Sequence, residues 1–492
     1  MADLNKSQDI RSIDTEKQQS INLNISDGVL SDGRVVDHGH IISNDHVVDP
    51  EDPGELRVLE IRQKFSALRS LRDWEQWLDA KMGVEGQGVE RIPEDKRVPP
   101  SRLNMIFIWF SNLMTPGGIP VGILGPEFGL SLSTSLILTI FATILGSAFP
   151  AFTATFSSAT GLRQIAVSRY AFGIQGAKLC GLLNIIVNIG FGVVNSIVSG
   201  QLLRAVSGDT LPLEIGIVII AVLGTVISVF GFRIIHTYER YAWILIFVLL
   251  LTHWGEAGHL FKLTRNEAHG LDYTGDCLSY FAIVFGSCTG SRVSDAYEDG
   301  GSGALILATL HPSGFGKFVC VMYSLSFLGN IIPIIYSSAL SVQLWGRHFH
   351  AIPRFIWCTV LGVIMLVLGL SGRNVLETIL SNFLSLLGYW TIAYTVIMFE
   401  EHFLFRKLVL KAGYDLHGWQ DQKKMPLGHA GTGALIAGFG VAFVGMNQTW
   451  YVGPVAKKIG AYGGDVGDYF SFVVSLVMYP VFRWLEIKFT GR

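Results

Sequence analysis

Three asparagines and a phenylalanine recur at helical spacing in one apolar stretch of the chain. With a nearby serine, the set is Asn184, Asn188, Phe191, Asn195 and Ser199. At about 100° per residue, side chains three or four positions apart share one face of a helix. Amides donate and accept hydrogen bonds, so this face could bind the polar edge of a small planar ligand while Phe191 packs on its flat side. Alternatively, the amides tie neighbouring helices together.

Two other apolar stretches contain helix-breaking residues. Thr115-Pro116-Gly117-Gly118-Ile119-Pro120 interrupts the first, and Gly329, Asn330 and Pro333 interrupt the one from Phe315 to Leu344. Proline leaves a helical carbonyl unpaired, which is tolerated at membrane depth only inside protein or beside water. Two interrupted spans are typical of the midplane site of a secondary transporter. The candidate substrate-binding residues are therefore Thr115, Gly117, Phe191, Asn195, Asn330 and Pro333.

Further polar residues lie within or beside apolar stretches. Asn382, Ser385 and Tyr389 form a shorter stripe that fits either a site or helix packing. Glu239 and Asp295 are candidates for a gate or a proton-linked carboxylate. The alternatives are that Glu239 anchors a loop to a neighbouring arginine and that Asp295 forms an exposed pair.

Several functional classes are excluded by the absence of their motifs. The sequence has no nucleophile–base constellation and no phosphate-binding loop, so we expect neither an enzyme nor an ATP-driven pump. The histidines and five cysteines lack metal-ligand spacing, so we expect no metal and no cofactor. A net charge of −2 argues against a nucleic-acid partner.

The composition is that of a polytopic membrane protein. Hydrophobic residues make up 50% of the chain and charged residues 15%. Apolar stretches recur that are long enough to cross about 30 Å of hydrocarbon, so the lipid bilayer is a partner and the fold is all-α. The candidate spans are 103–124, 130–152, 179–203, 211–230, 241–260, 278–288, 315–344, 352–370, 379–399, 430–444 and 470–484.

The chain divides into a polar tail and a membrane domain. We expect 1–100 to be a cytoplasmic N-terminal tail and 101–492 to be the transmembrane transporter domain. Apolar residues at helical spacing over 55–82 predict an amphipathic helix, which would lie on the membrane surface or pack within the protein.

Counting loop charges places the N-terminus inside and reveals a missing crossing. With this orientation, about twelve basic loop residues face the cytoplasm and about six lie opposite, the expected bias. The span before Asp295 should then end inside, while the one after Pro312 should begin outside. The apolar segment 304–310 is too short to cross. Either the two halves are assigned the wrong orientation relative to each other, or a span is absent; we favour the second and expect about one span to be absent near 295–313.

Several segments resemble a known family. They are Gly83–Glu94, Ile108–Leu113, Ser168–Gly173, His236–Tyr241, and Trp450–Gly460 followed by Gly463-Gly464-Asp465. Together they resemble fungal purine–cytosine permeases of the nucleobase:cation symporter family. The resemblance implies a leucine-transporter-like five-plus-five inverted repeat and proton-coupled import of cytosine, adenine, guanine or hypoxanthine across the plasma membrane. It also implies that Asn195, Asn330 and Pro333 match the family's third-span and eighth-span site motifs.

The chain departs from the family pattern at four places. Phe191 stands where the family usually has tryptophan, and Ile331 and Ile334 replace two motif asparagines. The sixth-span motif is altered and the seventh span is missing. A polar group of a nucleobase that faces hydrocarbon without a hydrogen-bond partner reduces the binding free energy by about 1–3 kcal/mol. The departures leave open two alternatives: a non-transporting, sensor-like or degenerate relative, and a transporter of another heterocycle such as a vitamin.

Overall fold

The structure, a computed structural model, describes most of the chain after residue 113. The backbone is described for 114–230, 232–258, 269–286, 304–416 and 418–492, for Asn266, and for scattered residues before 114. Among the earlier residues, β1 (Val35–Asp37), β2 (His40–Ser43) and β3 (His46–Val48) pair as an antiparallel sheet.

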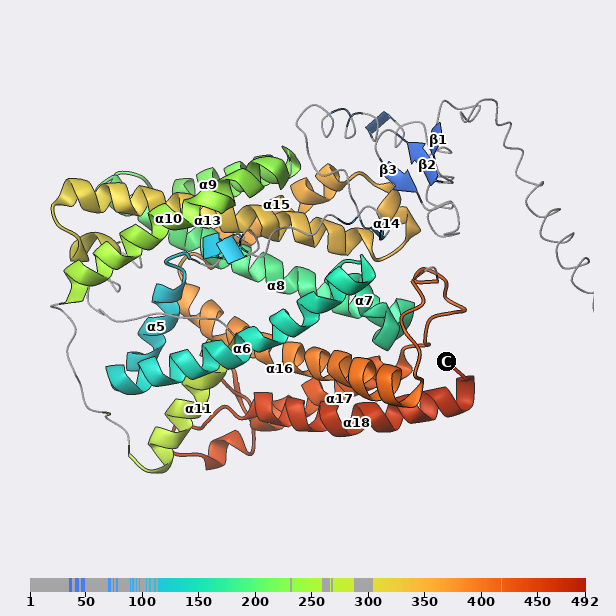
Figure 1. Cartoon of the computed structure of the whole chain (residues 1–492). Helices are drawn as coiled ribbons and strands as arrows, with labels where there is room; N and C mark the ends of the chain where they lie inside the picture. The colour runs from blue at the N-terminus through green and yellow to red at the C-terminus, as the bar shows by residue number, and fades with distance from the viewer. Residues whose placement is uncertain are drawn as a thin grey trace, which may run out of the picture.

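The membrane domain is helical, as expected (Figure 1). The α-helices are α5 (Gly118–Glu127), α6 (Leu132–Thr160), α7 (Gln164–Val167), α8 (Arg169–Val206), α9 (Leu213–Phe230), α10 (Phe232–Ala257), α11 (Leu271–Gly286), α13 (Ser313–Gln343), α14 (Arg347–Ala351), α15 (Arg354–Gly372), α16 (Leu376–Glu400), α17 (His429–Gly445) and α18 (Gly467–Thr490). The π-helix η3 (Glu401–Val409) extends α16. Before α18 lie strands β4 (Asn447–Gln448) and β5 (Tyr451–Val452) and the short helix η4 (Ala456–Lys458).

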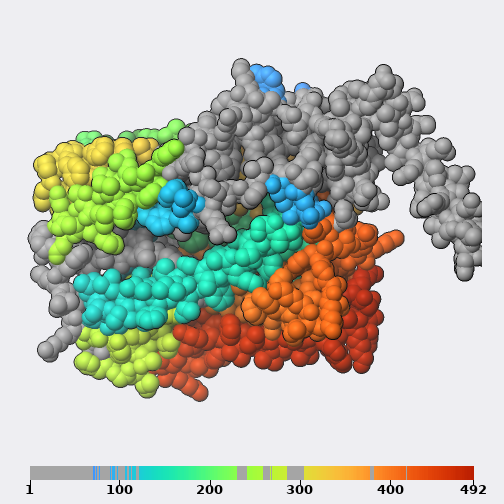
Figure 2. All heavy atoms as spheres, in the orientation of Figure 1, coloured from blue at the N-terminus to red at the C-terminus, as the bar shows by residue number. Residues whose placement is uncertain are grey.

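Many of these helices are suited to lipid. Among the described residues, six helices are long and apolar enough to cross a membrane, and three shorter apolar helices accompany them. Helix α6 runs across one face of the molecule in Figure 2. Its side chains Ile140, Phe141 and Ile144 are at least 56% exposed. Large apolar side chains are exposed at this density where lipid, rather than water, surrounds a helix.

Helices α8, α9, α13 and α15 pack together through small residues. A Cβ added at Gly216 of α9 would lie 2.9 Å from the backbone of Gly200 in α8, and one added at Gly362 of α15 would lie 2.2 Å from Thr225 of α9. Glycine permits such close helix contacts. In lipid there is no hydrophobic driving force between helices, so the van der Waals energy of close packing stabilises their association. Helices α16, α17 and α18 form a second group, below the first in Figure 1.

The predicted break in the first span is present. The described residues 110 and 111 are helical, residues 114–117 are not, and α5 begins at Gly118. A short non-helical connection over 114–117 therefore interrupts this span.

The predicted break near Pro333 is wrong, because α13 continues through it as one helix. A single missing hydrogen bond can be absorbed as a bend rather than an interruption. Tertiary contacts hold this turn, where Ser228 Oγ of α9 donates to the carbonyl of Ile332 at 3.1 Å. The first-span break thus has no counterpart in α13.

The connection between α11 and α13 is only partly described. After Gly286 the described residues resume at Ala304 with a helical segment over 304–309. Asp295 lies outside the described residues, so the absent span stays a prediction from the charge pattern.

Candidate functional site

Polar side chains join α8 and α13 along their antiparallel interface. Each pair couples a residue of one helix to a residue of the other. The hydrogen bonds are Asn184 Nδ2 to Ser341 Oγ at 3.0 Å, Asn195 Nδ2 to Asn330 Oδ1 at 2.6 Å, and Ser199 Oγ with Ser324 Oγ at 2.6 Å. The asparagine face predicted from the sequence is therefore turned toward the helix that carries the second polar group.

The Asn195–Asn330 pair is the central contact of this interface. Asn195 is only 7% exposed, and burial of an amide requires hydrogen-bond partners. Each amide can donate two hydrogen bonds and accept two. The bond between them uses one donor of Asn195 and one acceptor position of Asn330, so the pair has the chemistry to recognise the mixed donor and acceptor edge of a base.

An aromatic pair lies one turn away. The ring of Phe191 meets the ring of Phe383 in α16 edge to face, with centroids 5.6 Å apart and an interplanar angle of 78°. The Phe383 ring also rests on Gly190, where an added Cβ would lie 2.1 Å from a ring carbon. Glycine therefore allows α16 to approach α8 closely, and it places a second ring beside the candidate stacking residue.

The broken first span borders the same part of α13. Ser326 Oγ donates to the carbonyl of Met114 at 2.9 Å, and a Cβ added at Gly117 would lie 3.0 Å from the ring of Phe327. Gly117 N donates to Thr115 Oγ1 at 3.4 Å. Phe327 is one turn before Asn330, so the break and the amide pair are neighbours.

The two isoleucines of the altered motif face different helices. Ile331 is fully buried, and its Cγ2 would lie 2.7 Å from a Cβ added at Gly224 of α9. Ile334 instead approaches Gly192 of α8, which directly follows Phe191. Ile331 is thus a packing residue on the α9 side, whereas Ile334 borders the candidate site.

The remaining predicted residues are less informative. Pro333 lies on α13, one turn after Asn330. Glu239 lies in α10, but only its backbone is described, and Asp295 is outside the described residues. Asn188 Nδ2 is buried and has no hydrogen-bond partner among the described residues. The functional roles of Glu239 and Asp295 stay predictions.

The shorter stripe on α16 faces another part of the protein. Asn382 Nδ2 donates to Thr449 Oγ1 at 2.8 Å, and Tyr389 OH donates to Asp465 Oδ2 at 2.5 Å. These partners belong to the connection between α17 and α18, away from the amide pair. Asp465 was noticed in the sequence only as part of a motif, since its partners are brought to it by tertiary packing.

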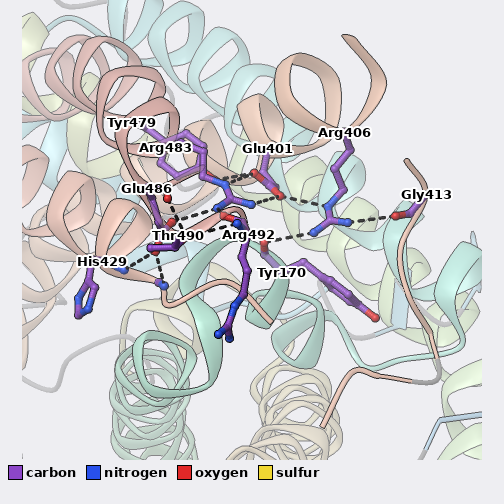
Figure 3. A network of polar contacts seen from close by, with 11 residues as sticks. Tyr170, Glu401, Arg406, Gly413, His429, Tyr479, Arg483, Glu486, Thr490 and Arg492 are labelled. Carbon is purple, nitrogen blue, oxygen red and sulfur yellow. Dashed lines mark hydrogen bonds and ion pairs between the residues drawn. The ribbon is translucent and has the colours of Figure 1, made fainter. Parts of the chain in front are cut away.

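A buried ionic network ties helix ends together (Figure 3). Arg483 of α18 pairs with Glu401 at 3.1 Å and with Glu486 at 3.0 Å. Glu486 Oε1 also accepts the backbone N–H groups of Gly428 and His429 at the start of α17, a position where an acidic group stabilises a helix. Arg406 completes the network, since it pairs with Glu401 at 3.1 Å.

The network also reaches the start of α8. Arg406 lies 5.0 Å from the ring centre of Tyr170 at the start of α8. Four elements, α8, η3, α17 and α18, are thereby joined. Within the described part of the chain, no three His, Cys, Asp or Glu side chains are grouped to hold a metal.

Comparison with known proteins identifies the family of this site. Residues 91–253 match the family described as "Permease for cytosine/purines, uracil, thiamine, allantoin". Purine-cytosine permease FCY2 of Saccharomyces cerevisiae is 31% identical, with 85% of this chain and 89% of FCY2 covered. Purine-cytosine permease fcyB of Emericella nidulans is 30% identical, with 85% and 92% covered. Vitamin B6 transporter TPN1 of Saccharomyces cerevisiae is 30% identical, with 87% and 92% covered.

A solved structure shows the same fold. Mhp1, a nucleobase-cation-symport-1 family transporter in a closed conformation with bromovinylhydantoin bound, aligns with a TM-score of 0.50. The alignment covers 79% of this chain and 92% of Mhp1 at 14% identity. The predicted fold class, an all-α, leucine-transporter-like membrane protein, is confirmed.

The identity and the coverage, together with the motifs read from the sequence, lead to one conclusion: this chain belongs to the family of permeases for cytosine and purines, uracil, thiamine and allantoin.

Proposed function

We propose that this protein is a secondary active transporter that imports purine bases and cytosine together with protons across the plasma membrane, with its N-terminus in the cytoplasm. The observation that carries the proposal is the partly buried hydrogen bond between Asn195 and Asn330, beside the broken first span. The names of the relatives FCY2 and fcyB support the substrate class.

The geometry suggests how a base would be held. A neutral base enters between α8 and α13, where Asn195 and Asn330 exchange their mutual hydrogen bond for bonds to its polar edge. Phe191 packs on the flat face of the base, as aromatic rings do at 4.5–7 Å between centres. The non-helical residues 114–117 supply backbone groups and a joint, and a bound proton favours the closed conformation.

A second candidate function is the transport of another heterocycle, such as a vitamin. Vitamin B6 transporter TPN1 is as similar to this chain as fcyB is. Ile334 lies next to the site in place of an amide, so it presents a methyl group where a base would seek a partner. A ligand with a less polar edge would lose less binding free energy beside Ile334.

Uptake by the full-length protein separates these functions. The tagged chain is expressed in a host that lacks its own nucleobase and vitamin B6 uptake, and its surface amount is measured by fluorescence. Radiolabelled adenine, guanine, hypoxanthine, cytosine and pyridoxine are then supplied in turn. We expect concentrative uptake of at least one base that a proton ionophore abolishes.

The other outcomes are equally clear. Uptake of pyridoxine alone would favour the second candidate function. Full surface expression without uptake of any compound would contradict transport and favour a sensor-like or degenerate relative.

A further inference from the structure

A buried acidic group lies between α11, α16 and the start of α18. At its centre, Asp465 Oδ2 accepts hydrogen bonds from Tyr389 OH at 2.5 Å and from Gln448 Nε2 at 2.9 Å. The backbone N–H of Asn447 donates to the same oxygen at 3.1 Å, and that of Gly467 donates to Oδ1 at 3.0 Å. Both oxygens of Asp465 are therefore satisfied.

The neighbouring carboxyl of Asp468 is not satisfied. Asp468 is 7% exposed, and its Oδ1 has no hydrogen-bond partner among the described residues. The carboxyl lies against the backbone of α16, because a Cβ added at Gly388 would be 2.5 Å from this oxygen. Gln448 is 5% exposed, and its Oε1 likewise has no partner in the described part of the chain.

Two buried acceptor oxygens without donors are costly. A buried polar group without a hydrogen bond lowers the stability of the folded protein by about 1–3 kcal/mol, and an ionised carboxylate lowers it by more. A protonated carboxyl changes this balance, because its O–H is a donor. One proton on Asp468 therefore removes the buried charge and turns an acceptor that has no donor into a donor.

Among the described residues, the titratable groups near the pair include no cation that would neutralise a buried carboxylate in place of that proton. Asp272 and Asp276 lie on α11, Tyr389 on α16 and Tyr469 on α18; all are acidic or neutral. Lys457 and Lys458 of η4 are exposed. No ion pair found between described residues involves either carboxyl of the pair.

The electrostatics of the satisfied carboxyl agree with the geometry. Burial raises the pKa of Asp465, although hydrogen bonds from Tyr389, the backbone and Gln448 oppose the shift. Asp465 and Asp468 also repel each other when both are ionised, so the pair favours a state that shares a single charge.

The pair is connected to a helix near the candidate substrate site. The backbone N–H of Asp465 donates to Ser279 Oγ of α11 at 3.0 Å. A Cβ added at Gly464 would lie 2.8 Å from the Cα of Gly275, so α11 packs directly on this segment. Helix α11 in turn packs against α5, which follows the broken first span.

We infer that Asp465 and Asp468 form the proton-binding site of this transporter, with Asp468 as the group that gains and loses the proton. The O–H bond forms at Asp468 with a proton taken from water, and the same bond breaks when the proton returns to water. Protonation removes the repulsion within the pair, on a segment whose backbone packs directly against α11. The inference rests on the proposed function, since it assigns the coupling proton of that transport cycle.

A pH titration of the purified full-length protein tests the site without any substrate. Trp390 directly follows Tyr389 and is 8% exposed, so its fluorescence can report on this group. We expect the wild type to show a fluorescence transition with pH that Asp468→Asn abolishes. The control Asp209→Asn removes an exposed carboxylate paired with Arg204 and should keep the transition. A transition that survives unchanged in Asp468→Asn would overturn the site.

A second variant shifts the titration instead of removing it. Tyr389→Phe deletes a donor to Asp465 and so makes the charged form of the pair less favourable. We therefore expect the midpoint of the transition to move to higher pH. A midpoint that stays in place, or moves to lower pH, would contradict the assignment even if Asp468→Asn did not fold.

Uptake measurements link the site to transport. Asp468→Asn imitates the protonated carboxyl, so it should keep the exchange of bases at every pH but lose at least about tenfold in concentrative uptake. Concentrative uptake that keeps its pH dependence in this variant would overturn the inference, and so would a wild-type dependence on Na⁺ instead of pH. If the wild type transports no base while its titration depends on Asp468, the proposed function fails and the proton site stands.

Discussion

Asn195 and Asn330 are 135 residues apart in sequence, yet their amides meet at 2.6 Å. The helical spacing and the family motif predicted both residues, but not the bond between them, because that bond depends on the register of α8 against α13. The same limit applies to Asp468 and Gln448. Neither residue was singled out, since burial without a partner is a property of the packed protein and leaves no periodic signal.

Replacing the two isoleucines tests which of them borders the site. Ile334→Asn adds an amide beside Gly192 of α8, so we expect stronger base binding with little change in surface expression. Ile331→Asn places an amide against Gly224 of α9 without a partner, which should cost about 1–3 kcal/mol in stability. Equal effects of the two variants on binding and on surface expression would contradict the placement of these side chains.

At the scale of elements, the sequence predicted where the spans lie but not how each begins and bends. The break in the first span was predicted by clustered proline and glycine, and it is present. The break in α13 was not found, because one proline can be accommodated when neighbouring helices hold the turn. Helix α8 begins at Arg169, ten residues before the candidate span 179–203, and there Tyr170 OH donates to the carbonyl of Asp415 at 2.8 Å.

Gly173 sets the bend at the start of α8. Its φ is 62°, and an added Cβ would lie 2.5 Å from the carbonyl oxygen of Pro426. We expect Gly173→Ala to destabilise the protein by about 1–3 kcal/mol, measured by thermal unfolding in detergent. Gly208 is a control for the positive φ alone, because its φ is 63° and nothing lies within 4 Å of an added Cβ. If Gly208→Ala lost as much stability as Gly173→Ala, the crowding of an added Cβ at Gly173 would contribute nothing to the destabilisation.

At the scale of the whole molecule, the ionic network joins helices that the sequence could only list separately. Removing Arg483 would leave Glu486 buried without its cation and would leave Glu401 paired with Arg406 alone; breaking a buried ion pair in this way costs about 3–5 kcal/mol. We expect Arg483→Met to lower the unfolding temperature, and Glu486→Gln in the same chain to restore part of it, because it neutralises the carboxylate left without a cation. The exposed Arg204 offers a control, since Arg204→Met should change little. An unchanged unfolding temperature in Arg483→Met would contradict a stabilising role for the network.

The predicted absence of one crossing also concerns the whole molecule. The charge pattern predicts this absence near 295–313, within and beside residues that the structure does not describe. The fold of Mhp1 is nevertheless shared over 79% of the chain. The pairing of α8 with α13 therefore forms with the sequence as it stands, and the transport activity of that sequence is open to direct measurement.

The central claim is that the Asn195–Asn330 pair binds the base, and equilibrium binding tests it most directly. The affinity of purified protein for radiolabelled adenine and cytosine is measured for the wild type, Asn195→Ala and Asn184→Ala. Asn184 is the matched control, because it lies on the same helix and bonds to Ser341. We predict that Asn195→Ala weakens binding about tenfold or more, as expected for a lost hydrogen bond of about 1–3 kcal/mol, while Asn184→Ala binds as the wild type does. Equal affinity in all three folded proteins would contradict the account.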